Sequence, residues 1–124
     1  EITKQNYVDV AEDAIKKLRK PDRNGGYKLE LTTSKIRNIL SMVSDLYTDA
    51  QHLREKTLGE DMVGRVQYLE CEAGRENSVK EFVRTANILP FIALVGNSRQ
   101  KLLLFCNYME ALVAYHKFYG GREN

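Results

Sequence analysis

The C-terminal stretch from Arg99 to Gly121 constrains the fold of this chain more than any other segment. It predicts one long helix, because Asn97 or Ser98 can cap its start and Gly120-Gly121 ends it. Apolar residues cover nearly all of its faces: Leu102, Phe105, Cys106, Met109, Leu112, Val113 and His116 form one wide stripe, and Leu104, Tyr108, Ala111, Tyr115 and Tyr119 cover the far side. Such a helix is buried on several sides, so we expect other helices to pack around it.

A membrane-spanning segment is the alternative for a helix this apolar. Asn107, Glu110, His116 and Lys117 lie within it, and these groups are costly inside a lipid bilayer. We therefore expect a cytoplasmic protein with no membrane contact.

The length of the chain allows one domain, spanning residues 1–124, with a real core. Hydrophobic residues make up 43% and charged residues 29%, which is the composition of an ordinary globular protein. The net charge of +2 is too small to indicate a nucleic-acid partner, so any basic surface must be local. The chain begins at Glu1 rather than at a methionine, which leaves room for a preceding segment.

Hydrophobic periodicity predicts further helices before the long one. They span about 6–20, 34–56, 61–73 and 78–87, and Pro90 begins a kink or a further short helix that Gly96 ends. Thr32 or Thr33 can cap the second helix, Gly74 closes the third, and Ser78 with Glu81 forms a capping box for the fourth. Val8, Ala11, Ile15 and Leu18 face inward from the first helix, whose charged outer face we interpret as ordinary solvated surface.

The segment between the first two helices contains strong turn chemistry in Asn24-Gly25-Gly26. Leu29-Glu30-Leu31 alternates and predicts a short extended piece, which by itself makes no sheet. The predicted fold is therefore all-α, a compact bundle of about five helices around a buried C-terminal helix.

Residues that could support catalysis or bind a metal are sparse. The two histidines differ in setting, because His116 lies on the most buried face of its helix and His52 on an outer face. Cys71 and Cys106 lack a CxxC neighbour, so we interpret them as free thiols, in the core or semi-buried, in a reducing compartment. No nucleophile, acid–base or phosphate-loop motif is present, and we expect no catalytic residue, metal or cofactor.

A polar strip follows the second predicted helix beside its apolar stripe. It contains Arg37, Ser41, Ser44, Thr48, Gln51 and His52, with Lys35 at the helix start and Arg54 and Lys56 at its end. Hydroxyl groups led by an arginine can donate hydrogen bonds to a phosphate backbone. Asp45 and Asp49 lie beside the strip and limit its positive potential. From the residues alone, an ordinary solvated face and a nucleic-acid surface are both possible.

Two further arginines are candidates for phosphate contact. Arg65 lies at the edge of the third helix's apolar stripe, and Arg75 follows Gly74 in an expected tight turn. The guanidinium group holds a phosphate through two parallel hydrogen bonds, and a neighbouring glycine permits close approach. Ion-paired or solvated arginines are the alternative. No aromatic sheet for base stacking is apparent, so any binding should be directed at the backbone and sensitive to salt.

Four pieces of the chain resemble a known family. They are Leu31-Thr-Thr-Ser-Lys-Ile-Arg-Asn-Ile-Leu-Ser41, Val66-Gln67 with Ala73-Gly74-Arg75, Val79-Lys-Glu-Phe-Val83, and the stretch from Phe105 to Gly121. The chain resembles the small helical subunit of the type III-A CRISPR effector, the Csm interference complex. The first and last pieces are the most specific, and together the pieces extend over most of the chain.

The resemblance implies a compact helical bundle without nuclease activity. Several copies would stack as a filament along the duplex of guide RNA and target RNA, opposite the subunits that carry the guide and cut the target. The large subunit would supply DNA cleavage and cyclic oligoadenylate synthesis. By position, contact with RNA would fall on Lys35 and Arg37 in the first piece, Arg65 just before Val66-Gln67, and Arg75. The helical wheel, and not a family motif, adds the polar-strip residues Ser41, His52, Arg54 and Lys56 as further candidates.

Two other classes of protein are alternatives. A helical DNA-binding regulator needs a recognition helix with base-reading side chains on a short helix pair. The second predicted helix is too long for that role and lacks such side chains. A protein-interaction adaptor could instead use the apolar segment from Ile88 to Val95, although we expect that segment to be core.

Overall fold

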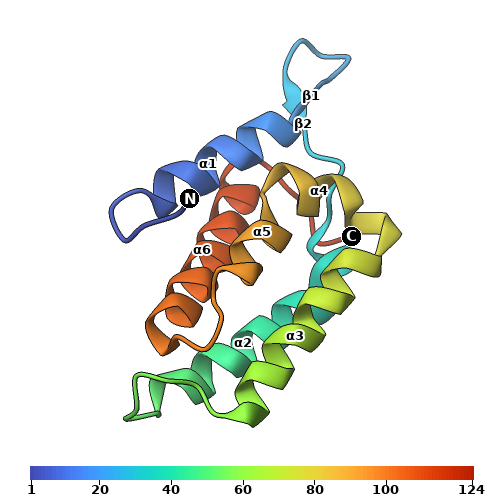
Figure 1. Cartoon of the computed structure of the whole chain (residues 1–124). Helices are drawn as coiled ribbons and strands as arrows, with labels where there is room; N and C mark the ends of the chain where they lie inside the picture. The colour runs from blue at the N-terminus through green and yellow to red at the C-terminus, as the bar shows by residue number, and fades with distance from the viewer.

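The computed structural model describes residues 1–124 and contains six α-helices and one short antiparallel hairpin (Figure 1). The elements are α1 (Tyr7–Leu18), β1 (Lys20–Pro21), β2 (Tyr27–Lys28), α2 (Arg37–Gln51), α3 (Glu60–Arg75), α4 (Lys80–Thr85), α5 (Ile88–Ala93) and α6 (Arg99–Phe118). Turns of 3-10 helix, Thr33–Ile36 and Asn77–Val79, lead into α2 and α4. The all-α prediction is confirmed.

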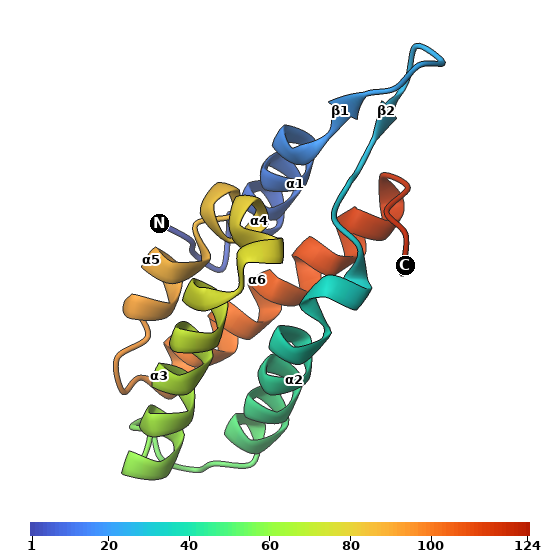
Figure 2. The same cartoon turned by 90° about the vertical axis from the view of Figure 1, so that its right-hand side faces the viewer.

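Helix α6 is the centre of the core, as the sequence predicts. It packs against α1 on one side and α2 on the other (Figures 1 and 2). Ser98 caps its start, because the Ser98 hydroxyl oxygen accepts a hydrogen bond from the Lys101 amide at 3.2 Å. Tyr108, on the far side of the helix, is fully buried as well, and its hydroxyl donates to the Ala86 carbonyl oxygen at 2.7 Å. A tyrosine tolerates such a site because its hydroxyl group finds a partner.

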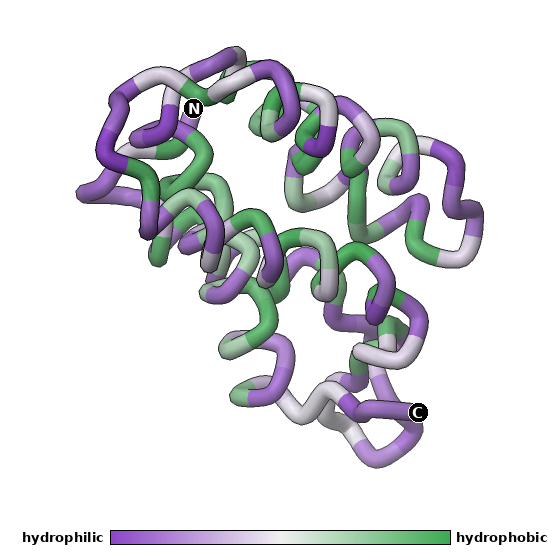
Figure 3. Tube along the Cα trace, turned by 90° about the horizontal axis from the view of Figure 1, so that it is seen from below, coloured by the Kyte–Doolittle hydropathy of each residue, from purple (hydrophilic) through white to green (hydrophobic).

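Hydrophobic residues gather where the helices face one another, whereas hydrophilic residues occupy the loops and chain ends (Figure 3). The apolar segment around α5 belongs to this core, since Ile88, Phe91, Ile92 and Val95 are buried. Asn87 adopts a left-handed backbone with φ of 53°, which separates α4 from α5 and explains why six helices form where about five are expected.

The second helix is shorter than predicted, because α2 ends at Gln51 rather than near Lys56. The segment after it pairs with the turn before α6 instead. The Leu58 amide donates to the Asn97 carbonyl oxygen at 2.7 Å, and the Arg99 amide donates to the Lys56 carbonyl oxygen at 2.9 Å. Leu58 is also buried. These long-range contacts outweigh the helical pattern, which is a weak preference.

The side-chain caps that the sequence predicts for α2 and α4 do not form. Thr32 makes no side-chain cap. The Thr33 and Ser34 amides donate instead to the carbonyl oxygens of Arg122 and Glu123, at 3.1 and 2.8 Å. Helix α3 also continues through Gly74, which was expected to close it.

The capping box before α4 is likewise absent. The Ser78 hydroxyl donates to the Glu76 carboxylate at 3.0 Å, and the Glu81 carboxylate lies 3.5 Å from the Lys20 ammonium group. Both side chains therefore have partners outside the box.

The extended piece that the sequence places at Leu29–Leu31 is not a strand. The hairpin lies just before it, where Lys20 pairs with Lys28 and Pro21 pairs with Tyr27. Gly25 supplies the turn, with φ of 83°. Leu29 is buried, so this residue anchors the chain as it leaves the hairpin.

Candidate nucleic-acid interface

The polar strip lies on the outward face of α2. Arg37, Ser41, Ser44, Thr48 and His52 are all exposed, at spacings of three or four residues that place them in one row. The opposite face of α2 buries Ile39, Val43, Leu46 and Ala50. His52 is less available than the others, because its Nδ1 lies 2.9 Å from the Thr48 carbonyl oxygen. The row therefore presents one unpaired arginine and several hydroxyl groups to solvent.

Lys35 extends the row at the start of α2. It lies in the 3-10 turn Thr33–Ile36, is exposed and makes no ion pair. The neighbouring Lys20 is different, since its ammonium group lies 3.4 Å from Glu30 and 3.5 Å from Glu81. Hydrogen bonding to the Glu30 carboxylate raises the pKa of Lys20. Unlike Lys20, both Lys35 and Arg37 at this end of α2 lack an acidic partner.

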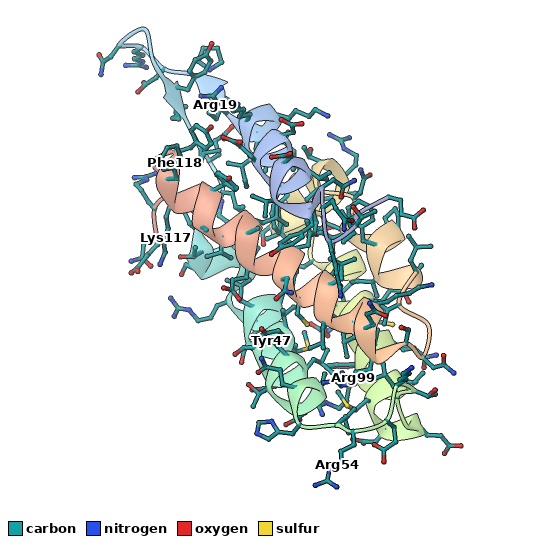
Figure 4. All side chains as sticks on the ribbon, turned by 90° about the vertical axis from the view of Figure 1, so that its left-hand side faces the viewer. Arg19, Tyr47, Arg54, Arg99, Lys117 and Phe118 are labelled. Atoms are coloured by element: carbon teal, nitrogen blue, oxygen red, sulfur yellow. The ribbon has the colours of Figure 1, made fainter.

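Arg54 and Lys56 lie beyond the end of α2, in the segment that leads to α3. Both side chains are exposed and neither makes an ion pair. Figure 4 shows Arg54 pointing away from the bundle at the end opposite the hairpin. Their placement on a loop corrects the expectation that they extend the helix, but it leaves them near the C-terminal end of the strip.

Arg65 is held within the fold by an ion pair. Its guanidinium group lies 2.8 Å from the Asp49 carboxylate and joins α3 to α2. A cleft of about 530 Å³ beside it is lined by Asp45, Glu60 and Asp61. These carboxylates make the surroundings of Arg65 acidic. Arg65 is therefore an ion-paired arginine in this structure, rather than one that is free to contact phosphate.

Arg75 is also paired, although its side chain is more exposed than that of Arg65. It contacts Glu72 within the last turn of α3, and its side chain is 71% exposed. Arg75 is the last residue of α3 and does not lie in a turn after Gly74 as predicted. The exposed Arg75 guanidinium group can reach another anion, but Glu72, whose side chain is only 15% exposed, competes for it.

Two basic residues that the sequence reasoning did not select lie near Arg75. Lys80 and Arg84 are exposed on α4 and make no ion pair. They line a groove of about 680 Å³ together with Gly74 and Asn87. Their spacing of four residues on a predicted helix is a signal that would have found them, because such residues share one face.

The remaining candidate groups are structural. His116 is buried, and its Nε2 lies 2.7 Å from the Leu31 carbonyl oxygen, as expected of a core histidine. Both cysteines are free; Cys106 is buried as expected, and burial raises the pKa of its thiol to about 12. Cys71 is exposed, which corrects the expectation of a core or semi-buried thiol, because it lies on the outer face of α3. No group of three His, Cys, Asp or Glu side chains is arranged to hold a metal ion. None of the helices has the length and apolarity that crossing a bilayer requires.

Comparison with known proteins identifies the family. The family model described as Csm2 Type III-A matches residues 10–122. A relative from Streptococcus thermophilus, named CRISPR system Cms protein Csm2, is 46% identical over 123 residues, which is 98% of each chain.

Two more relatives carry the same name. The one from Mycobacterium tuberculosis is 40% identical over 121 residues, or 94% of each chain. The one from Enterococcus italicus is 39% identical over 95 residues, or 72% of this chain and 68% of the relative. These matches confirm the resemblance to the small subunit of the Csm complex. The chain therefore belongs to the Csm2 family of type III-A CRISPR systems.

Proposed function

We propose that this chain is a non-catalytic, RNA-binding subunit of a type III-A Csm effector complex. Several copies stack along the duplex of guide RNA and target RNA and support target binding in defence against viruses and plasmids. The observation that carries the proposal is the outward face of α2 and of the turn before it, where Lys35, Arg37 and Ser41 are exposed without acidic partners. Membership of the Csm2 family supplies the complex and its other subunits as partners.

The chemistry of this face suits a phosphate backbone. Arg37 can hold two phosphate oxygens at once, and Ser41 can donate a single hydrogen bond beside it. Helix α2 has 15 residues, so the row is about 22 Å long at about 1.5 Å per residue. Sugar–phosphate contacts carry no direct sequence information, so this mode of binding tolerates any guide sequence.

The other candidate residues differ in how readily they can contact phosphate. Arg54 and Lys56 extend the positive surface beyond the end of α2, and His52 lies between them and the strip. Arg65 and Arg75 must first release Asp49 and Glu72 before they can bind phosphate. We therefore expect Arg37 to contribute more to RNA affinity than either of the paired arginines.

Assembly is tested by co-expression with a tagged backbone subunit, the large subunit and a guide RNA of a type III-A system. We expect several copies of the chain in the purified complex and stronger retention when target RNA is added. Its absence from a correctly assembled complex would contradict the proposal. Preference of the isolated chain for one duplex DNA sequence would favour the regulator alternative.

The RNA contacts are tested by the salt dependence of target-RNA affinity. Arg37→Ala, Arg65→Ala and Arg75→Ala are each compared with the parent complex, and Lys4→Ala serves as control because Lys4 is exposed near the N-terminus. Each lost phosphate contact lowers the slope of log affinity against log salt by about one. An unchanged slope in the triple arginine variant would refute the assignment of these sites.

A further inference from the structure

The β1–β2 hairpin projects from the bundle at the end where α6 terminates (Figure 2). Its two strands have two residues each, and the turn is closed by a hydrogen bond from the Asp22 amide to the Gly26 carbonyl oxygen at 2.8 Å. Pro21, Tyr27 and Lys28 are exposed in this hairpin, whereas Lys20 is partly buried. The hairpin thus carries side chains away from the core.

Aromatic rings and one guanidinium group form a contiguous cluster at the base of this hairpin. The guanidinium carbon of Arg19 lies 4.6 Å from the ring centre of Tyr27 and 5.0 Å from that of Tyr119. The ring of Phe118 meets Tyr119 edge to face, with ring centres 5.0 Å apart. In Figure 4, Arg19 and Phe118 lie at the same end of the molecule. Residues from β2 and α6 therefore build a single surface around Arg19.

The inner and outer rings of this cluster have different roles. Tyr119 is partly buried, and its hydroxyl donates to the Glu12 carboxylate at 2.6 Å, which ties α6 to α1. In contrast, Phe118 is 74% exposed and Tyr27 is 63% exposed. Packing of the fold accounts for Tyr119, but not for the exposure of two large rings, of which Tyr27 contacts Arg19 and Phe118 contacts Tyr119.

The same region concentrates positive charge. Residues 16–28 contain six basic residues and one acidic residue, although the whole chain has a net charge of only +2. Lys17, Arg23 and Lys28 are exposed and make no ion pair. Arg19 has no carboxylate partner either, and its Nε has no hydrogen-bond partner. We call Arg19, Arg23, Tyr27, Lys28 and Phe118 the hairpin face.

We propose that the hairpin face binds unpaired RNA nucleotides, whose bases stack on Phe118 and Tyr27 while their phosphates contact Arg23 and Lys28. Exposed aromatic rings beside unpaired cations are the combination by which proteins hold single-stranded nucleic acid. Bases within a duplex offer no free face for such stacking. The choice of RNA rests on the proposed function, which places this chain in an RNA-containing complex. The inference adds a second surface, which binds unpaired nucleotides, to the face of α2 that we propose contacts the duplex.

The charge of this surface argues for nucleic acid rather than for a protein partner. The centre of a protein–protein interface is depleted in charged residues, with lysine in particular under-represented. Arginine and aromatic rings are common at protein interfaces as well, so Arg19, Tyr27 and Phe118 do not decide between the two partners. The deciding residue is Lys28, which is exposed next to Tyr27 and has no acidic partner. A phosphate backbone complements this charge, whereas an apolar protein patch does not.

The test uses the full-length chain and a short single-stranded RNA that contains 2-aminopurine, whose fluorescence falls when the base stacks. Addition of the protein at low salt should quench the fluorescence. Phe118→Leu and Tyr27→Leu keep apolar side chains but remove the rings, and each should weaken binding by about fivefold or more and reduce the quenching at saturation. Tyr68→Leu is the matched control, because Tyr68 is 59% exposed on α3 and lies outside the hairpin face.

The outcomes separate this inference from the proposed function. Unchanged affinity in both ring variants, or equal losses in Tyr68→Leu, would overturn the inference. Tighter binding of single-stranded DNA of the same sequence would overturn its assignment to RNA. A duplex RNA probe measured in parallel reports on α2, so an Arg37→Ala variant that leaves duplex binding unchanged counts against the proposed function alone. Circular dichroism of each ring variant verifies that the helices are intact.

Discussion

Gly121 is a residue whose missing side chain matters to the fold. A β carbon at this position would overlap the imidazole ring of His116, which is only 2% exposed. The Gly121 amide also donates to the His116 carbonyl oxygen at 2.7 Å. We expect Gly121→Ala to lower the free energy of unfolding by about 1–3 kcal/mol, because a buried ring cannot move without displacing its neighbours. Urea denaturation measures this change.

Gly64→Ala provides the matched comparison. Gly64 lies inside α3, and a β carbon there would meet no atom within 4 Å. Alanine is a better helix former than glycine, so this variant should be more stable by about 0.5–1 kcal/mol. If Gly121→Ala and Gly64→Ala shifted the urea midpoint in the same direction, the overlap with His116 would not be the controlling factor.

The ionisation of two buried groups predicts a loss of stability at alkaline pH. Burial raises the pKa of the Cys106 thiol from 9.0 to about 12, and it also raises the pKa of the Tyr108 hydroxyl. The folded chain therefore keeps protons that the unfolded chain releases above about pH 9. Because the unfolded state then binds fewer protons, the free energy of unfolding is highest below pH 9 and falls as the pH rises toward 12.

The measurement is urea denaturation between pH 8 and pH 11, with Cys106→Ala as the comparison. Cys106→Ala should reduce the steepness of this fall, since only Tyr108 then contributes from this pair. At pH 8 the variant is also less stable because its side chain is smaller, so slopes rather than absolute values are compared. Equal slopes in the two proteins would show that Cys106 does not control the effect.

Arg99 is a side chain of one helix that caps the C-terminal end of another. It is the first residue of α6, yet its Nε donates to the Ala50 carbonyl oxygen at 2.8 Å, at the C-terminal end of α2. A cation at that end also interacts favourably with the helix dipole. We expect Arg99→Ala to lower the free energy of unfolding by about 1–2 kcal/mol, as measured by thermal and urea denaturation.

Lys101→Ala is the control for this prediction. Lys101 lies in the same first turn of α6, is exposed and makes no ion pair. Surface substitutions of this kind change stability by no more than about 0.5 kcal/mol. A comparable loss in both variants would indicate a general effect of positive charge near α2 rather than the specific cap that Arg99 forms.

Local patterns predicted those features that depend on a single element. The apolar stripe of α6, the exposed row on α2 and the turn at Gly25 all follow from periodicity or turn chemistry. Features that join distant segments were not predictable. The end of α2 depends on pairing with Asn97, and the ion pair of Arg65 depends on Asp49 from another helix. The sequence therefore predicted which residues form the row on α2, but not which arginines are held in ion pairs.

Across the whole molecule, α6 connects the two surfaces that we propose bind RNA. At its C-terminal end, Tyr119 ties α1 and the hairpin to α6 through Glu12 and Arg19. The tail that follows runs to the start of α2 (Figure 2), where the Arg122 and Glu123 carbonyl oxygens accept hydrogen bonds from Thr33 and Ser34. The tail therefore fixes the turn that carries Lys35, while the hairpin face is held by side chains of α6.

Deletion of the tail should consequently affect the two surfaces differently. Without residues 122–124, the amides of Thr33 and Ser34 lose their carbonyl partners, and we expect the free energy of unfolding to fall by about 1–3 kcal/mol. The salt-dependent affinity for duplex RNA should fall as well, because the turn that carries Lys35 loosens, whereas quenching of single-stranded RNA at the hairpin face should be unchanged. The double variant Arg122→Ala/Glu123→Ala retains both carbonyl groups and should match the parent in stability. If it lost as much stability as the deletion, the side chains and not the main-chain carbonyl groups would hold the start of α2.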